Sequence, residues 1–181
     1  MYWTTTYASP VGTLTLASRD GAAVSGLWLE GQKYFGGKWA QQLSPLKRDC
    51  PAFRAGKMWL DRYFAGLQPD GRELPIAPEG TRFQLAVWEL LRKIPYGKIT
   101  TYGALAQELA CSLGKPSLSP QAVGGAVGHN PISILVPCHR VVGSHGNLTG
   151  YAGGLERKIW LLQHEGVGVE QLIRPRQGTA L

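Results

Sequence analysis

The chain has 181 residues, enough for one substantial domain or two small ones, and its 17% charged content excludes wholesale disorder. Nineteen Lys and Arg against twelve Asp and Glu give a formal charge of +7, which favours polyanionic partners without defining a fold. No apolar run is long enough to span a bilayer, and the N-terminus lacks a secretory signal pattern, so we expect no membrane partner.

The three cysteines, Cys50, Cys111 and Cys138, are odd in number and widely spaced. They indicate neither a disulfide framework nor paired zinc knuckles. We therefore expect free thiols in a reducing, cytoplasmic environment, or a nuclear one if the source is eukaryotic. No role for Cys50 or Cys111 follows from the sequence.

The first third of the chain has the pattern of a small α/β domain. Residues 6–30 alternate Thr, Val and Leu between Ser-Pro, Asp-Gly and Gly turns, which indicates a β-meander. From Phe53 to Leu67, aromatic and aliphatic side chains recur at helical spacing. Residues 68–80 are rich in Pro, Gly and acidic side chains and form a candidate linker. We predict an N-terminal α/β domain over residues 1–78, with a small β-sheet plus one helix.

The chain after the linker is mainly helical. Thr81 and Gln84 fit a capping box at the start of a helix that ends at residues 95–97. A short helix is expected over residues 102–110, and another from Pro120, capped by Ser119, to Gly128. Two successive short helices resemble a helix-turn-helix, although the connector at 111–119 is longer than the standard tight turn.

The remaining segments complete the predicted second domain. Residues 132–136 are apolar and suit a buried strand, and the Gly-rich residues 141–154 suit a hairpin or wing. A final helix over 155–165 closes at Gly166. We predict a mainly α, winged helix-turn-helix-like domain over 79–172, followed by a disordered tail over 173–181.

Cys138 is the strongest chemical candidate. It follows the predicted strand at 132–136 and is adjacent to His139 and Arg140, whose positive surroundings favour a thiolate. An unperturbed cysteine is only a few per cent thiolate near neutral pH, so a nucleophile needs such help. The alternative is a buried core cysteine, which is what most free cysteines are. The adjacent basic side chains favour the nucleophile.

At this point the sequence resembles a known family, the O6-alkylguanine-DNA alkyltransferases. The resemblance covers about residues 83–166, and its motifs occur in the family's order. The first eighty residues match only in general character. The shared motifs are PYG at 95–97, TYG at 101–103, AVGGA at 122–126, NP at 130–131, ILVPCHRVV at 134–142, GYAGGL at 150–155, WLL at 160–162 and HEG at 164–166.

The resemblance implies DNA repair by direct alkyl transfer. A helix-turn-helix domain would dock in the minor groove of duplex DNA, and the damaged guanine would flip out of the stack. Cys138 would then take the alkyl group from O6-alkylguanine, and O4-alkylthymine is a further possible substrate. The thioether is stable, so the protein would be a single-turnover methylated-DNA–[protein]-cysteine S-methyltransferase. It would need no cofactor and would act as a monomer.

The resemblance also assigns roles around the nucleophile. His139 and Glu165 would activate Cys138 through a water molecule, Tyr102 would donate to the leaving guanine, and Asn130 would brace the turn that holds the cysteine. Without the family motif, simpler roles are open for each residue. His139 could be a surface histidine bound to phosphate, and Glu165 a solvated carboxylate at a helix end. Tyr102 could be a half-buried aromatic residue, and Asn130 a polar residue just past a helix.

Further assignments concern the base pocket and the DNA. The carbonyls of Val136 and Cys138 would accept the guanine amino group, and Tyr151 and the Ala152 amide would line and close the pocket. Small residues in the helix from Pro120 would permit close approach to DNA, although they could equally serve helix packing. The predicted DNA contacts are Gln121, Ala122, Gly124 and Arg140.

One departure from the family pattern keeps a second function open. The family has an arginine where this chain has Gln121, which lacks the charge and the planar guanidinium. The alternative function is therefore a lesion sensor that flips alkylated bases and recruits other repair proteins. A cysteine hydrolase would need oxyanion donors that no motif marks, and a sequence-specific regulator would need long polar side chains on its recognition helix.

We predict no metal site. All four histidines lie at or beyond His129, and Cys50 is the one cysteine in the N-terminal domain, so the ligand cluster of a structural zinc site is missing there.

Overall fold

The computed structural model describes residues 2–45 and 49–175, which divide into two compact units. The first unit is the described part of Met1–Glu79 together with Pro131–Leu135. The second is Gly80–Asn130 with the described part of Val136–Leu181. A small sheet plus helices confirms the α/β class. No helix in the described part of the chain is both long and apolar enough to cross a membrane.

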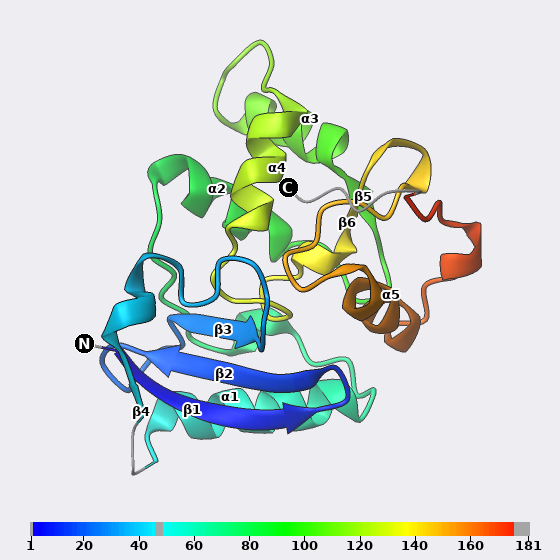
Figure 1. Ribbon diagram of the computed structural model, residues 1–181. Coiled ribbons are helices and arrows are strands. Elements are labelled where there is room, and N and C mark those ends of the chain that lie inside the picture. The colour runs from blue at the N-terminus through cyan, green and yellow to red at the C-terminus, as the bar shows by residue number, and fades with distance from the viewer. Residues whose placement is uncertain (1, 46–48, 176–181) are drawn as a thin grey trace. The chain divides into compact units, whose positions relative to one another are not determined.

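The first unit holds a four-stranded sheet in the order β3-β2-β1-β4 (Figure 1). β1 (Tyr2–Ser9), β2 (Gly12–Ser18) and β3 (Gly26–Leu29) pair antiparallel, which is the predicted meander. β4 (Leu43–Pro45) pairs parallel with β1 at the sheet edge. Its pairing was not predicted, because three residues carry no detectable period.

Helix α1 (Pro51–Phe64) packs against this sheet (Figure 1). It begins with Pro51 at its first turn, where a missing N–H costs nothing, and it buries the predicted aromatic face. A side chain at Gly56 would bring its Cβ within 2.6 Å of Leu16 Cδ2 on β2. Glycine at that position therefore permits the close contact between helix and sheet.

The predicted linker is in fact part of the first unit. Val24 donates its N–H to Pro75 O at 3.0 Å, and Ala77 donates to Val24 O at 2.8 Å. Trp59 Nε1 donates to Asp70 O at 3.0 Å. These bonds satisfy the backbone along the segment, so Pro and Gly here mark an ordered edge and not a flexible connection.

Residues 132–136 are buried as expected, but the strand predicted for them is wrong. Leu27 N donates to Pro131 O and Ser133 N donates to Leu27 O, both at 2.8 Å, which makes only an isolated parallel bridge. The chain then turns sharply, because Leu135 N donates to Ser133 O at 2.9 Å around Ile134, whose φ is 71°. A γ-turn with positive φ is strained for a β-branched residue. The turn ends the extended run before Val136.

Three helices of the second unit follow the prediction closely. They are α2 (Arg82–Leu91), α3 (Tyr102–Ser112) and α4 (Pro120–Gly128), and they pack on one another. The capping box is confirmed. Gln84 N donates to Thr81 Oγ1 at 3.2 Å, and Thr81 N donates to Gln84 Oε1 at 2.9 Å. Ser119 caps α4 as expected. Trp88 Nε1 donates to Ala126 O at 2.8 Å and joins α2 to α4.

The second unit also contains a two-stranded parallel sheet. β5 (Thr100–Thr101) pairs with β6 (Val141–Val142), so no hairpin forms from β6. The chain after β6 closes a short loop in which Gly143 N donates to Asn147 O at 2.7 Å. Ile173, assigned to the disordered tail, accepts from Leu148 N at 2.9 Å and donates to Gly146 O at 3.0 Å, so the predicted tail begins too early. Residues 176–181 of the predicted tail lie outside the described residues.

Helix α5 (Leu155–His164) ends as predicted at Gly166. Gly166 N donates to Gln163 O and Val167 N donates to Leu162 O, both at 2.9 Å, with Gly166 at φ 77°. This pattern is a Schellman motif, and it makes Glu165 the C-cap residue. Val167 packs against the cluster that includes Leu162, which anchors the end of the helix.

Candidate functional site

Cys138 lies in a tightly turned segment just before β6. It begins a short 3₁₀ helix, Cys138–Arg140, and its N–H donates to Val136 O at 2.8 Å. Pro137 at the centre, with φ −80° and ψ 64°, has the angles of an inverse γ-turn. Asn130 Nδ2 donates to Val136 O at 2.7 Å and lies 3.1 Å from Cys138 Sγ. One amide therefore joins the turn to the sulfur.

The sulfur is almost shielded from solvent. Cys138 is 5% exposed, and burial raises the pKa of its thiol. The hydrogen bond from Asn130 and the positive charge of Lys158 oppose that rise. A thiol in this position needs a base to become a nucleophile, because the neutral form is favoured.

A buried carboxylate organises the groups beside the nucleophile. Glu165 Oε1 accepts from His139 Nε2 at 2.7 Å, and Arg140 donates through Nε at 2.8 Å to Oε2 and through Nη2 at 3.0 Å to Oε1. Gly97 N donates to Oε2 at 3.2 Å. Burial alone raises the pKa of Glu165, but His139 and Arg140 outweigh it and hold the pKa well below its usual range. Glu165 is therefore a carboxylate.

The charge on Glu165 fixes the tautomer of His139. Burial lowers the pKa of His139 more than Glu165 raises it, so the neutral ring is favoured. A neutral imidazole that faces a carboxylate carries its proton on Nε2 and leaves Nδ1 as an acceptor. His139 Nδ1 is buried and has no hydrogen-bond partner within the described residues. The ring therefore offers a free base inside the site.

Arg140 has a different place from the one predicted. Its guanidinium binds Glu165 and also donates through Nη1 to Ile94 O at 2.6 Å. It lies 5.7 Å from the centroid of the Tyr96 ring. The side chain is buried, so this geometry argues against the predicted DNA contact. Removing a carboxylate from water is costly unless a cation compensates it. Arg140 supplies that cation and orients Glu165.

A glycine makes room for the backbone carbonyl of Glu165. Gly97 has φ 70°, a conformation that other residues adopt only with strain. A Cβ at Gly97 would lie 2.7 Å from Glu165 O. Because Glu165 also caps α5, the helix end and this glycine together set where its side chain begins.

Two tyrosines lie near the sulfur. Tyr102 follows β5 directly, and its hydroxyl donates to Gly150 O at 3.0 Å, with Thr149 O at 3.3 Å. Burial and the charge of Cys138 raise the pKa of Tyr102. The Tyr151 hydroxyl is buried with no partner in the described structure, and its ring meets that of His139 edge-on at 6.4 Å. Ala152 is half-buried in the turn that follows.

The carbonyl of Val136 is not free to bind a substrate. It accepts from Asn130 Nδ2 at 2.7 Å and from Cys138 N at 2.8 Å. A carbonyl oxygen has two lone pairs, and these bonds use both. The predicted acceptor role of Val136 for the guanine amino group is therefore at odds with the structure, and the same carbonyl instead holds the cysteine turn.

Lys158 belongs to this site and was missed in the sequence. It is 0% exposed, and its Nζ donates to Val141 O and Thr149 O, both at 2.6 Å. Burial lowers the pKa of Lys158 to about 8, although Cys138 opposes that change. Helical periodicity could have found it, because Lys158 lies three residues after Leu155 and four before Leu162, on the apolar face of α5.

The predicted DNA contacts on α4 differ in their exposure to solvent. Gln121 and Ala122 are exposed, and Gly125 has open space where a Cβ would lie. We call these three residues the α4 face. Gly124 is buried, so its predicted role as a DNA contact is at odds with the structure. Ser119 Oγ donates to Gln121 Oε1 at 2.8 Å.

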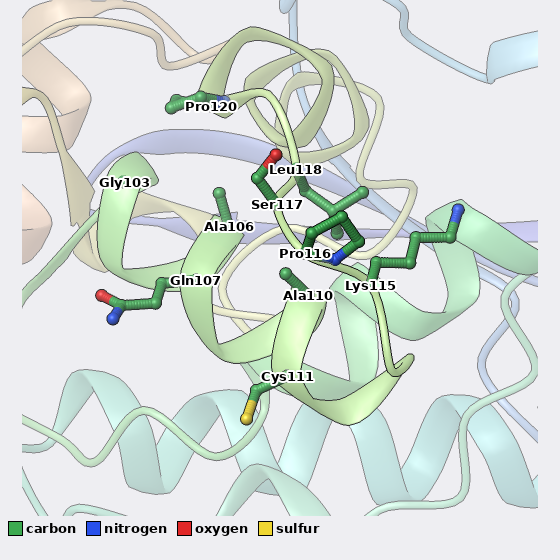
Figure 2. Close-up of a pocket in the computed structure, with 10 residues that line it drawn as sticks. All are labelled: Gly103, Ala106, Gln107, Ala110, Cys111, Lys115, Pro116, Ser117, Leu118 and Pro120. Carbon is green, nitrogen blue, oxygen red and sulfur yellow. The ribbon is translucent and has the colours of Figure 1, made fainter.

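A cavity of about 340 Å³ lies between α3 and the connector, away from these groups (Figure 2). None of the predicted site residues lines it, and its polar side chains extend in different directions in Figure 2; they are those of Gln107, Cys111, Lys115 and Ser117. It therefore lacks convergent polar groups. Within residues 2–45 and 49–175, no cluster of three or more His, Cys, Asp or Glu could hold a metal.

Comparisons with known proteins agree on one family. A family model described as "6-O-methylguanine DNA methyltransferase, DNA binding domain" matches residues 82–167. The methylated-DNA–protein-cysteine methyltransferase of Haemophilus influenzae is 44% identical over 162 residues, covering 89% of this chain and 84% of the relative. That of Methanosarcina acetivorans is 42% identical over 164 residues, covering 88% and 96%.

Solved structures give the same result. The O6-methylguanine methyltransferase of Mycobacterium tuberculosis is 41% identical with a TM-score of 0.73, over 91% of this chain and 93% of that one. The M. tuberculosis OGT in complex with DNA is 37% identical with a TM-score of 0.73, over 94% of each chain.

Proposed function

This chain belongs to the methylated-DNA–protein-cysteine methyltransferase family, and we infer that it repairs alkylated DNA by transferring the alkyl group to one of its own cysteines. We propose Cys138 as the acceptor. The observation that carries this assignment is the buried cluster that Glu165 forms with His139 and Arg140, the two residues that follow Cys138, within the region that the family model matches. The relatives named above are transferases, so a lesion sensor is not adopted.

The first proposed step removes the thiol proton. The proton passes from Cys138 Sγ through one water molecule to His139 Nδ1, the free acceptor of the ring. Glu165 stabilises the resulting imidazolium through Nε2, and Arg140 keeps Glu165 ionised and oriented. A positioned base of this kind contributes about 10² to 10⁴ in rate.

The second step is an in-line displacement. The Cys138 thiolate attacks the alkyl carbon, so that the S–C bond forms as the C–O6 bond breaks and the electron pair leaves with guanine. The guanine anion takes up a proton, for which Tyr102 is the proposed donor. The Tyr102 hydroxyl must then exchange its bond to Gly150 O for one to guanine. The thioether product has no route back to a thiol, so each molecule acts once.

The proposed DNA contact uses the α4 face. We propose that α3 and α4 act as a helix-turn-helix, within the predicted winged domain, and that Gln121, Ala122 and Gly125 enter the minor groove of duplex DNA. Gln121 would occupy the space left by the flipped base, which would reach Cys138 beside Tyr151 and Ala152. Flipping costs a few kcal/mol, and less where the lesion already weakens pairing. The protein would work as a monomer, in the compartment that holds its DNA, which we predict to be the cytoplasm.

Peptide mapping tests the acceptor directly. The protein is incubated with a slight excess of duplex carrying one O6-methylguanine, digested and analysed by mass spectrometry. We expect one methyl group per molecule, on Cys138, and none in Cys138→Ser. Cys111→Ser is the matched control and should accept a methyl normally, because Cys111 is exposed and outside the site. Tight binding of the lesion duplex with Cys138 unmodified would reject transfer.

A further inference from the structure

The last segment of the second unit that the structure describes is bonded to the loop that follows β6. We call residues 168–173 the C-terminal strap (Figure 1). Leu148 N donates to Ile173 O at 2.9 Å, and Ile173 N donates to Gly146 O at 3.0 Å. Ile173 therefore uses both of its backbone groups to hold residues 146–148.

The side chains of the strap attach it less completely than its backbone does. Val169 and Leu172 pack against the core cluster that contains Leu148. However, a cavity of about 210 Å³ lies between the strap and α5, and the Ile173 side chain is half exposed. Empty space removes contacts that would otherwise fix the segment. The hold of the strap on the loop therefore depends on the two hydrogen bonds of Ile173.

The chain that the strap holds leads directly into the candidate site. We call residues 150–154 the site loop. The ring of Tyr151 meets that of His139, the neighbour of the proposed acceptor, edge-on at 6.4 Å. Gly150 and Gly154 bound the loop with φ values of 75° and 91°, which glycine adopts without strain. The site loop can therefore pivot at both ends, while the strap holds the chain that precedes it.

The site is closed in this structure. Cys138 is 5% exposed, and the Tyr151 hydroxyl is buried. A guanine that reaches the sulfur must displace part of the surrounding chain, and the site loop can move without breaking a helix or a strand. A methyl group is small enough for the loop to return, whereas a bulky group keeps it displaced. Whatever resists displacement of the loop therefore acts more strongly against bulky groups.

We propose that the C-terminal strap determines specificity: by fixing the chain before the site loop, it limits the size of the alkyl group that Cys138 accepts and favours small groups such as methyl. The selection among alkyl groups rests on the proposed function, but access to the sulfur can be measured without DNA. The strap acts through the site loop and not by contact with the reacting atoms.

The test variant removes one of the two hydrogen bonds. Ile173→Pro lacks the N–H that bonds to Gly146 O. The preceding residue, Leu172, has φ −95° and ψ 148°, the extended conformation that a following proline favours. Ile173→Ala is the matched control, because it shortens the same side chain and keeps both backbone bonds. All proteins carry Cys111→Ser, which removes an exposed thiol.

The first assay uses two reagents with the same reactive group and different sizes, iodoacetamide and N-benzyliodoacetamide. The rate at which each alkylates Cys138 is measured by mass spectrometry of the peptide. In Ile173→Pro the ratio of the benzyl rate to the smaller reagent's rate should rise about two- to tenfold, the range that loss of one backbone hydrogen bond gives. Ile173→Ala should keep the parent ratio. An unchanged ratio in Ile173→Pro overturns the proposal.

A further control separates access from general loss of stability. Val87→Ala removes part of a buried side chain on α2, which packs on α3 and α4. This variant destabilises the same unit and leaves the strap intact, so its ratio should stay at the parent value. If Val87→Ala raises the ratio as much as Ile173→Pro does, the strap has only a structural role and the proposal is wrong.

The second assay measures single-turnover transfer from a duplex that carries either O6-methylguanine or O6-benzylguanine. The ratio of the benzyl to the methyl rate constant should rise in Ile173→Pro by a similar factor. Division by the methyl rate removes any common loss of folding or of DNA binding. A parent-like ratio overturns the proposed selection. If the reagent ratio rises but even the parent protein takes no alkyl group from either duplex, the proposed function fails and control of access by the strap stands.

A second variant applies if Ile173→Pro does not fold. Leu172→Ala weakens the attachment of the strap to the core cluster and leaves the backbone groups of Ile173 in place. Both ratios should rise in Leu172→Ala, by a smaller factor than in Ile173→Pro. Parent-like ratios in a folded Leu172→Ala protein would show that the strap does not control access to the sulfur.

Discussion

The Cys138 site and the α4 face belong to the same compact unit but are built in opposite ways. Around Cys138, the ionisable side chains of His139, Arg140 and Glu165 are buried, and Glu165 accepts hydrogen bonds from the other two. On the α4 face the side chains are small or uncharged and open to solvent. Fixed charges in a dry site act strongly on a reaction, whereas DNA affinity comes mainly from phosphate contacts at the surface. Changes at the first region should therefore alter rate and pH dependence, and changes at the second should alter affinity and salt dependence.

The largest effect is expected at Glu165. Glu165→Gln keeps the shape but removes the charge that stabilises the His139 imidazolium, so single-turnover methyl transfer should slow about 100-fold or more. Binding of the lesion duplex should stay within a few-fold. The rate is measured by quenched-flow transfer from O6-methylguanine duplex. Glu156→Gln, an exposed carboxylate on the same helix, is the control. A Glu165→Gln rate close to that of the control would mean that the relay does not limit transfer.

The next effect is expected at Asn130. Asn130→Ala leaves the Val136 carbonyl with one donor fewer and removes the contact to Cys138 Sγ. The carbonyl keeps its bond from Cys138 N, and loss of one hydrogen bond costs about 0.5–1.5 kcal/mol, so urea unfolding should show a loss of that size. Transfer should slow as well, because the thiolate loses a hydrogen bond. A variant as stable and as fast as the parent protein would show that Pro137 and the γ-turn hold the sulfur without the amide.

Acid should act on the same buried groups. The folded pKa of Glu165 lies below its ordinary 4.5, so its contribution to stability is present above pH 4.5 and is lost as pH falls toward the folded value. The folded pKa of His139 is below its ordinary 6.5, so the unfolded chain binds more protons and stability also falls below pH 6.5. Urea midpoints across that range should decline, and the decline below pH 4.5 should be shallower in Glu165→Gln. Equal slopes in both proteins would contradict the charge state assigned to Glu165.

The smallest effect is expected on the α4 face. Gln121→Arg adds a charge at the exposed start of α4, so DNA binding should tighten severalfold and its salt dependence should steepen by about one phosphate contact. Alkylation of Cys138 by iodoacetamide should not change. Gln107→Arg places the same charge on α3 and controls for net charge alone. If both variants bind DNA equally well, the α4 face has no special part in binding.

Local chemistry explains what could be predicted from the sequence. The capping box of α2 and the Ser119 cap with Pro120 at the start of α4 depend on residues within one helical turn, so the starts of both helices were visible in the sequence. The family motif, and not periodicity, brought Cys138, His139 and Glu165 together. Their contact depends on the C-cap at Glu165 and on the room at Gly97, which lie in separate segments.

The errors have a common physical cause, which is dependence on distant partners. Arg140 next to a cysteine indicates a cation near the nucleophile, but nothing nearby in sequence reveals that Glu165, 25 residues away, binds it. Val136 was assigned to the substrate because the two donors to its carbonyl could not be seen. Gly124 and Gly125 are identical in sequence, so which of them faces inward depends on the packing of α4 against α2 and α3. Lys158 was also missed, but here helical spacing would have been enough to place it, because it lies on the apolar face of α5.

The short β5–β6 pairing has a consequence for how the protein matures. It joins Thr100 to Val141, so the chain that forms α3, the connector and α4 must close into a loop when the pairing forms. Contacts between residues so far apart in sequence form slowly, because closing the intervening chain costs entropy first. Until then Tyr102 and Cys138 are separate, and the cysteine is an ordinary thiol. We therefore expect the complete site around Tyr102 and Cys138 to form late in folding, after the local contacts of the helices.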